Sequence, residues 1–234
     1  TSKYGVVAQV AVNKNMINFF DKYPSAYIGN DATTRWAVYA NTPLDPTIAA
    51  ALYPRLRTAL EGLSERDAVN KLLQFVQTAF VYEYDDKVWG GDRAFFAEES
   101  LYYPYCDCED RSILFSRLVR DLLGLKVLLV YYPGHLATAV EFHSPVNGDY
   151  INLNDRKFTI CDPTYIGAPV GITMPDMNND EAMVILEITT GDVYIEIGID
   201  KVEAFEGDFV FVPSMLVYRV CSFDPASVRV MVFS

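Results

Sequence analysis

The stretch YPYCDCEDRSILFSRLVRDLLGLKV, residues 103–127, marks the point at which the chain changes from helices to strands. Its apolar residues recur with the 3.6-residue period of a buried helix from about 108 to 123, and Gly124 is a natural stop. After Gly124 the period falls to two, which predicts strands over 126–132, 135–142, 149–153 and 157–162. Helices followed by strands predict an α+β fold, with N-terminal helices packed on an antiparallel sheet.

The segments before this stretch favour two helices, with one strand before them and a loop after them. Their patterns predict, in chain order, a strand over 34–40, helices over 45–63 and 64–84, and a loop over 85–107. Asp45 and Pro46 suit the start of the first helix, and Pro54 is expected to bend or split it. Ser64 begins a capping box for the second helix, with Asp67 in the place of the usual Glu or Gln.

The end of the chain carries a different pattern. Residues 163–182 are rich in loop-forming residues, and the last fifty residues read as strands. We therefore expect one domain over 1–190 and a C-terminal β segment over 191–234, either appended to the main sheet or forming a partial module. Part of this segment resembles the second half of a cupin-type module. It is too short to close a cupin barrel, and we interpret it as a small β appendage.

Composition and charge restrict the class of protein. The chain has 234 residues, 51% of them hydrophobic, which is enough to bury a core. A net charge of −12 disfavours nucleic acid and anionic membrane surfaces as partners. The sequence has no apolar run of about 18 residues and no signal-peptide pattern at its start. The chain begins without Met, so it can be part of a longer polypeptide, and both a cytoplasmic and an extracytoplasmic bacterial location stay open.

Few residues of this chain can carry nucleophilic chemistry. Four cysteines and only two histidines are present, so Cys–His chemistry must use His135 or His143. Cys108 falls at the start of the predicted helix, where backbone N–H groups favour a thiolate, although the flanking acids should raise its pKa. His135 opens a predicted strand and Asp162 ends another. A thiol, an imidazole and a carboxylate placed in this way are typical of a nucleophile, a base and the group that orients the base.

Three motifs together resemble the transglutaminase-like superfamily of cysteine hydrolases, namely CEDRSILFSRLVRDLLGLKV, GHLATAV and ICDPTY. The resemblance covers roughly residues 45–175 and includes the approach EESLYYPYCDCEDRS. It implies a papain-like core in which Cys108 is the nucleophile, His135 the base and Asp162 the orienting carboxylate. It further implies acyl chemistry on amide bonds through a thioester, with peptidase or amidase activity favoured over protein crosslinking.

Other interpretations of the same residues stay open. The domain could be catalytically inactive and serve as a binding or assembly module. A zinc site built from Cys106, Cys108, Cys161 and His135 has the wrong cysteine spacing for a metal knuckle. Strand alternation turns Cys161 to the face opposite Asp162, which indicates packing. Cys106 stands where many members of the superfamily have Gly, and we interpret it as structural or incidental.

Aromatic residues near the candidate nucleophile are candidate walls of a cleft. Trp89 could donate its indole N–H to an oxyanion or line the cleft, and Tyr103 and Tyr105 could line it too. The backbone N–H of Cys108 is the firmer oxyanion donor. No cofactor is implied, and the sequence has no Asp-x-Asp-x-Asp-Gly calcium loop. The expected partner is a protein or peptide that offers a glutamine side chain or a peptide bond.

The three candidate residues make one geometric demand on the fold. His135 and Asp162 can meet only if their strands are neighbours in the sheet. The short strand over 149–153 must then pair on the outer side of the strand over 157–162. If the short strand lay between the other two, the three residues could not act together.

Overall fold

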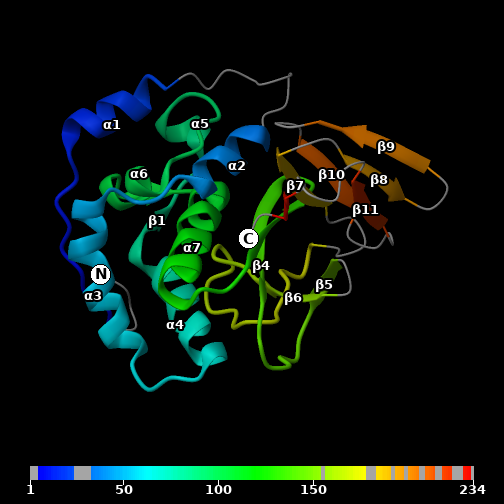
Figure 1. The fold of residues 1–234 in the computed structure, drawn as a ribbon. Coiled ribbons are helices and arrows are strands. Elements are labelled where there is room, and N and C mark those ends of the chain that lie inside the picture. Colours follow the sequence, from blue (N-terminus) through cyan, green and yellow to red (C-terminus); the bar gives the residue numbers. More distant parts are fainter. Residues whose placement is uncertain are drawn as a thin grey trace.

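Helices and strands gather on opposite sides of the molecule (Figure 1). The computed structural model describes residues 5–23, 33–153, 156–177, 183–190, 193–197, 200–205, 209–213, 218–222 and 229–232. The helices of these residues are α1 (Lys14–Asp21), α2 (Thr33–Asn41), α3 (Pro46–Leu60), α4 (Glu65–Ala79), α5 (Asp85–Val88), α6 (Ala97–Tyr102) and α7 (Cys108–Leu123). Together with the antiparallel strands they confirm the predicted α+β class. None of the described helices is both long and apolar enough to cross a membrane.

The main sheet contains most of the strands that follow α7. Its members are β3 (Val127–Tyr132), β4 (His135–Glu141), β5 (Tyr150–Leu153), β6 (Arg156–Cys161), β7 (Met183–Thr190), β10 (Phe209–Pro213) and β12 (Arg229–Val232). The strand order is β10–β7–β3–β4–β6–β5, and β12 pairs with β7. Strands β4 and β6 are antiparallel neighbours, and β5 pairs on the outer side of β6. This order confirms the geometric demand made by the three candidate residues.

The C-terminal strands divide between two sheets. β8 (Val193–Ile197), β9 (Asp200–Ala204) and β11 (Tyr218–Ser222) form a separate three-stranded sheet in the order β11–β8–β9. Strands β10 and β12 instead return to β7 in the main sheet. The described strands of the segment over 191–234 therefore belong partly to the main sheet and partly to this three-stranded sheet.

Helix α7 forms the centre of the core. Several of its side chains are fully buried, namely Ile113, Leu114, Phe115, Leu118 and Val119. Helices α4, α2 and α6 pack against it, and β3 and β4 contact it as well, so it lies between the helical half and the sheet (Figure 1). A helix enclosed in this way carries apolar residues over most of its surface. Its first turn is accordingly held in place by well-packed neighbours.

The predicted helix starts are confirmed by their caps. The Asp45 side chain accepts the N–H of Thr47 at 2.8 Å, and Pro46 is the first residue of α3. Ser64 caps α4 by accepting the N–H of Asp67 at 3.2 Å. Pro54, however, does not split the predicted helix over 45–63, because α3 continues through it from Pro46 to Leu60. The buried apolar face of α3 outweighs the one backbone hydrogen bond that a proline removes.

The prediction of a strand over 34–40 is wrong, because these residues belong to α2. Trp36, Tyr39 and Ala40 are buried, and their spacing of three and four residues matches one face of a helix. The aromatic and β-branched residues of this segment favour a strand locally. Packing of α2 against α7 overrides that preference.

The segment between α4 and α7 is more ordered than predicted. Helix α4 ends at Ala79, and the predicted helix over 64–84 extends five residues too far. The expected loop over 85–107 contains α5, α6 and β2 (Tyr105–Cys106), which pairs in parallel with β1 (Val81–Tyr82). These elements are two to six residues long. Such short elements show no complete hydrophobic period, so the sequence pattern does not reveal them.

Gly124 should contribute to stability through its backbone alone. It ends α7 in the left-handed conformation, with φ at 68°, and a Cβ at this position would meet no atom within 4 Å. We expect Gly124→Ala to lower the free energy of unfolding by about 1 kcal/mol, measured from urea midpoints. Gly91→Ala is the matched control, because Gly91 also has open space but no positive φ. Equal losses in the two variants would contradict a backbone origin.

Candidate functional site

The candidate nucleophile Cys108 is the first residue of α7, and a capping box fixes its backbone. The Asp107 carboxylate accepts the N–H groups of Glu109 at 3.2 Å and of Asp110 at 3.5 Å. In return, the Asp110 carboxylate accepts the N–H of Asp107 at 3.2 Å. Its second oxygen accepts the N–H of Phe95 at 2.8 Å, which joins the start of α7 to the segment before α6. Two of the acids around the thiol therefore serve the helix start.

The candidate base and its orienting carboxylate form a buried hydrogen-bonded pair. His135 Nε2 lies 2.9 Å from Asp162 Oδ2, and the two side chains are 6% and 2% exposed. His135 is the first residue of β4, directly after Gly134, whose φ is 77°. Ala139 of β4 pairs with Ile160 of β6, so His135 and Asp162 are near-diagonal positions on one face. The register of the two strands thus brings the pair together.

The Asp162 carboxylate is held on both of its oxygens. Oδ1 accepts the backbone N–H of Thr164 at 2.8 Å and of Tyr165 at 3.2 Å. Oδ2 is left for the His135 imidazole. Hydrogen bonds of this kind fix the direction of a carboxylate and stabilise its charge. Asp162 can therefore hold the imidazole ring at Nε2.

The beginning of β4 lies directly against the first turn of α7. The backbone N–H of Leu136 hydrogen-bonds to the Cys108 sulfur, and this bond offsets only part of the burial that raises the pKa of the thiol. One helical turn later, the Ser112 hydroxyl donates to the Leu136 carbonyl at 2.9 Å. Both polar groups of Leu136, the residue after His135, thus bind to the same face of α7. Within the described part of the chain, no hydrogen bond joins the Cys108 sulfur to the His135 ring itself.

The surroundings of Cys108 oppose its ionisation. The side chain is 9% exposed, and burial is the main cause that raises the pKa of its thiol. The Asp107 and Glu109 carboxylates raise the pKa further. This direction agrees with the expectation from the acidic sequence around the thiol. A thiolate at Cys108 would need a cation beside it, and His135 is the candidate.

Cys106, the second thiol beside the helix start, contacts a different group from Cys108. Its side chain is 3% exposed, and burial raises the pKa of its thiol to about 12. Arg111 Nε donates to the Cys106 sulfur at 3.4 Å. Cys161 is fully buried in the core, as predicted for a packing residue. Cys106 and Cys108 therefore serve different neighbours, and it is Cys108 that lies against β4.

Carboxylates near Cys108 are close enough to one another to resemble a cation site. Oxygens of Asp85, Asp92 and Glu109 lie within 4.8 Å of one another. Arg35 already forms ion pairs with Asp92 and, at 3.4 Å, with Glu109. Its guanidinium supplies positive charge to this cluster. The zinc set considered from the sequence is not among the groups with metal-ligand spacing in the described residues.

The three aromatic candidates form one cluster beside a pocket. The ring of Trp89 contacts the ring of Tyr103 edge-on at 4.9 Å between centroids and that of Tyr105 at 6.4 Å. Arg93 lies over the Trp89 ring at 4.2 Å. Trp89 and the residues up to Ala94 line a pocket of about 430 Å³. Trp89 therefore lies in a pocket wall, and the two tyrosines pack on it.

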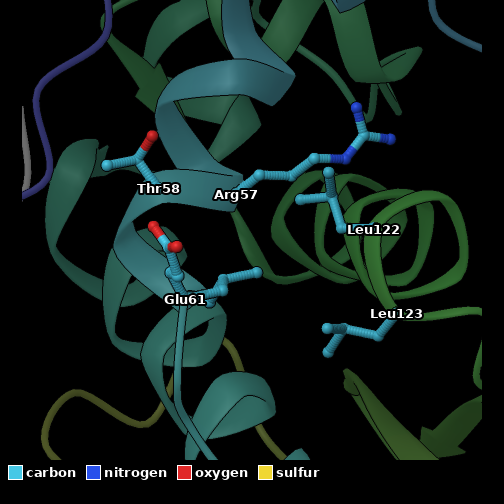
Figure 2. Close-up of a pocket in the computed structure, with 6 residues that line it drawn as sticks. Arg57, Thr58, Glu61, Leu122 and Leu123 are labelled. Carbon is cyan, nitrogen blue, oxygen red and sulfur yellow. The ribbon is translucent and has the colours of Figure 1, made fainter.

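A second pocket, of about 420 Å³, lies at the other end of α7 (Figure 2). Arg57 and Thr58 of α3 and Glu61 just after it line this pocket on one side, and Leu122 and Leu123 line it from the last turn of α7. Fourteen residues of helix separate Leu122 from Cys108, which corresponds to about 20 Å. This pocket is therefore remote from the candidate nucleophile.

Sequence reasoning missed three polar residues that support the site. Gln77 and Arg111 are both fully buried, and Arg35 joins Asp92 to Glu109. A signal existed for Gln77, because it lies four residues after Leu73 on the apolar face of α4. A polar residue in such a stripe indicates a specific buried partner.

A scan of protein-family models finds no match to this chain, and a search of curated proteins finds no relative. The transglutaminase-like resemblance thus rests on the three motifs alone. What the site can do chemically follows from its own residues: a thiol at a helix start, a buried imidazole on the adjacent strand, and a carboxylate that fixes the imidazole.

Proposed function

We propose that this protein carries out cysteine-dependent acyl chemistry on amide bonds, with Cys108 as nucleophile, His135 as base and Asp162 as orienting carboxylate. The observation that carries the proposal is the buried hydrogen bond of 2.9 Å between His135 Nε2 and Asp162 Oδ2. A buried polar pair of this kind, whose histidine directly precedes the residue that contacts the Cys108 thiol, is the expected support of a general base. A papain-like core, which the three motifs imply, is part of the same proposal.

The proton path follows from the two ring nitrogens. Asp162 holds the Nε2 proton, so the neutral ring presents its Nδ1 lone pair. Nδ1 takes the thiol proton from Cys108, and the resulting imidazolium offsets the charge of the thiolate. Asp162 stabilises this imidazolium without itself taking a proton. The pair thus compensates for the burial and the acids that oppose ionisation of Cys108.

The acyl transfer itself has two steps. The Cys108 thiolate attacks the carbonyl carbon of an amide, and the N–H of Cys108 donates to the oxyanion. The amine leaves with the proton from His135, and a thioester remains on the sulfur. Water activated by His135 then releases a carboxylic acid and regenerates the thiol. A protein or peptide is the proposed substrate, and hydrolysis is favoured over transfer to an amine.

A second candidate function is that of an inactive domain that binds or assembles with a partner. The observation that favours it is the environment of Cys108. Burial and two adjacent carboxylates keep its thiol protonated, and within the described residues the sulfur has no direct hydrogen bond to the His135 ring. A fold that keeps the three residues without forming the thiolate would have this arrangement.

Alkylation by iodoacetamide separates these two functions. We expect Cys108 to react at pH 6 at least about tenfold faster than Cys221 of the same chain, because the imidazolium stabilises its thiolate. His135→Ala should remove this advantage. The rate at each cysteine is measured by mass spectrometry of peptides between pH 5 and 9.

Cys106→Ala is the matched control, because it removes the neighbouring thiol and leaves the Cys108–His135 pair. It should leave the pH profile of Cys108 unchanged. A Cys108 that reacts no faster than Cys221 at pH 6, with or without His135, would support the inactive domain. Peptide and amide substrates become worth screening only if Cys108 shows the fast, His135-dependent alkylation.

A further inference from the structure

The side chain of Gln77 is fully buried and bonds to the loop that begins at Asp162. Its Nε2 donates to the carbonyls of Asp162 at 3.0 Å, Tyr165 at 2.8 Å and Ala168 at 3.0 Å. Its Oε1 accepts the N–H of Gly167 at 3.2 Å. One amide therefore contacts four backbone groups of a seven-residue loop, and its two N–H hydrogens are shared among the three carbonyls. Buried backbone groups left without partners would cost about 1–3 kcal/mol each.

This loop also determines where the Asp162 carboxylate points. Two N–H groups of the loop, those of Thr164 and Tyr165, bind Oδ1 and leave Oδ2 facing His135. Gln77 holds the main chain at Asp162 and at Tyr165, on both sides of this turn. A change in the loop would rotate Oδ2 away from the imidazole, since strand β6 ends at Cys161 and no longer fixes the backbone.

Gln77 contacts the nucleophile side of the site as well. Its backbone carbonyl accepts a hydrogen bond from Arg111 Nη1 at 3.4 Å. Arg111 belongs to α7 and follows Cys108 by three residues. The last turn of α4 is thus bonded to the helix of Cys108 through the main chain and to the loop of Asp162 through a side chain. One residue links the two halves of the constellation.

We propose that Gln77 is a positioning residue, which sets the Asp162 loop and through it the orientation of the His135 imidazole toward Cys108. This inference rests on the proposed function, because it assigns a role within the same three-residue constellation. Gln77 acts through Asp162 and touches neither the sulfur nor the imidazole. A misplacement of about 1 Å in such a support can lower a rate by about 100-fold.

Gln77→Asn tests the proposal while keeping the helix and an amide. Its side chain is one methylene shorter, so its amide cannot reach the three loop carbonyls together. We expect the alkylation rate of Cys108 at pH 6 to fall by about tenfold or more, with the pH profile moving toward that of His135→Ala. Gln77→Glu keeps the full length and the oxygen that accepts the Gly167 N–H, but it loses the donor to the three carbonyls, so its alkylation rate should also fall below that of the wild type. Circular dichroism establishes a temperature at which all the variants are folded. The alkylation rates are compared at that temperature.

Asn70→Ala is the matched control. Asn70 also belongs to α4, and its Oδ1 accepts the N–H of Val170 at 3.2 Å, beyond the part of the loop that Gln77 holds. The variant loosens the same helix–loop contact without touching residues 162–168. We expect its pH profile to match the wild type. If Asn70→Ala and Gln77→Asn reduce the rate equally, general loosening explains the effect and the proposal is overturned.

A second readout does not depend on thiol reactivity. The chain has only two histidines, so the ring N–H resonances of His135 are readily assigned by NMR, with the exposed His143 as an internal reference. A hydrogen bond to Asp162 should shift the Nε2 proton of His135 downfield in the wild type. We expect that resonance to be lost or broadened in Gln77→Asn and retained in Asn70→Ala.

The two readouts keep the two proposals apart. If wild-type Cys108 shows no His135-dependent reactivity, the proposed function fails, while the Nε2 resonance still decides whether Gln77 positions the pair. If the wild type is reactive and Gln77→Asn keeps both its pH profile and its Nε2 resonance, the role of Gln77 is refuted alone. If Gln77→Asn is too unstable to label, Gln77→Glu takes its place in the test. A wild-type Nε2 resonance and a wild-type alkylation rate in Gln77→Glu would then refute the proposal.

Discussion

The free energy of unfolding should fall by about 4 kcal/mol as the pH rises from 5 to 8, because carboxyl groups around Cys108 are buried. Burial, followed by the charge of Asp85, raises the pKa of Asp107 to about 7. Burial, followed by the charge of Asp107, raises the pKa of Glu109 to about 8. The pKa of fully buried Asp110 is also raised, mainly by burial.

The sign follows from the protons held in each state. In the unfolded chain these carboxyls have ordinary pKa values near 4. Between about pH 4 and pH 8 the native state therefore holds more protons than the unfolded state, and stability decreases with pH. The contribution is complete below the unfolded pKa and is lost as the pH passes through the folded pKa. A shift of three units in one carboxyl corresponds to about 4 kcal/mol, and coupled neighbours do not add in full.

Urea unfolding at pH 5, 6, 7 and 8, at constant ionic strength, measures this slope. Glu109→Gln should flatten the upper part of the curve, because it removes one buried proton site. Glu61→Gln, at an exposed position just after α3, should leave the slope unchanged. Stability that stays level or rises from pH 5 to 8 would contradict the prediction.

The same variant connects stability to reactivity. After burial and the charge of Asp107, the Glu109 carboxylate is the next cause that raises the pKa of the Cys108 thiol. Glu109→Gln should therefore make Cys108 react faster with iodoacetamide at pH 8, while Arg35 keeps its ion pair with Asp92. The acids at the start of α7 thus oppose the thiolate most strongly at alkaline pH. A cysteine enzyme with this arrangement would work best near neutral or acidic pH, where the carboxyls hold their protons.

Local periodicity predicted the parts of the fold that are long and regular. Helix α7 and strands β3 to β6 lie within two residues of their expected bounds, because each buries a face that repeats along the sequence. Helix α2 was mistaken for a strand, because its burial is decided by α7, some 70 residues later in the chain. The strand neighbours β4 and β6 were predictable only from the demand that His135 meet Asp162.

The candidate site divides in the same way. Cys108, His135 and Asp162 could be singled out because the chain has few thiols and imidazoles and because their positions fit expected element ends. Gln77 and Arg111 could not, because their partners are distant in sequence: 85 residues separate Gln77 from Asp162, and 34 separate Arg111 from Gln77. A single sequence gives no measure of which buried polar residue meets which backbone group. The structure supplies that pairing.

Replacing Arg111 should have the largest effect on stability of any single change outside the apolar core. Its side chain is fully buried, and Nη2 donates to the carbonyl of Phe80 at 3.0 Å, beside the contact of Nη1 with Gln77. These carbonyls belong to the C-terminal end of α4, where helix carbonyls lack internal partners. The guanidinium also lies 5.3 Å from the ring centroid of Tyr82. Within the described residues, no ion pair joins Arg111 to a carboxylate, so the negative end of the α4 dipole and these carbonyls offset its charge.

We expect Arg111→Met to lower the free energy of unfolding by about 3–5 kcal/mol, because it leaves two buried carbonyls and the Cys106 sulfur without a donor. Arg111→Lys should lose slightly less. It keeps the charge, but a single ammonium cannot reach the carbonyls and the sulfur together. Urea midpoints at one pH compare the stabilities of these variants. The control is Arg66→Met, at an exposed position on α4, which should change the free energy of unfolding by less than about 0.5 kcal/mol.

A different outcome for Arg111 would also be informative, since removing a buried charge relieves the cost of taking it out of water. If Arg111→Met were as stable as the wild type, that desolvation cost would equal the gain from its hydrogen bonds. The last turn of α4 would then be held by Gln77 and by packing alone. In that case Cys108 should keep its wild-type alkylation profile in Arg111→Met. A stable variant with an altered profile would instead mean that Arg111 fixes the start of α7 without contributing to stability.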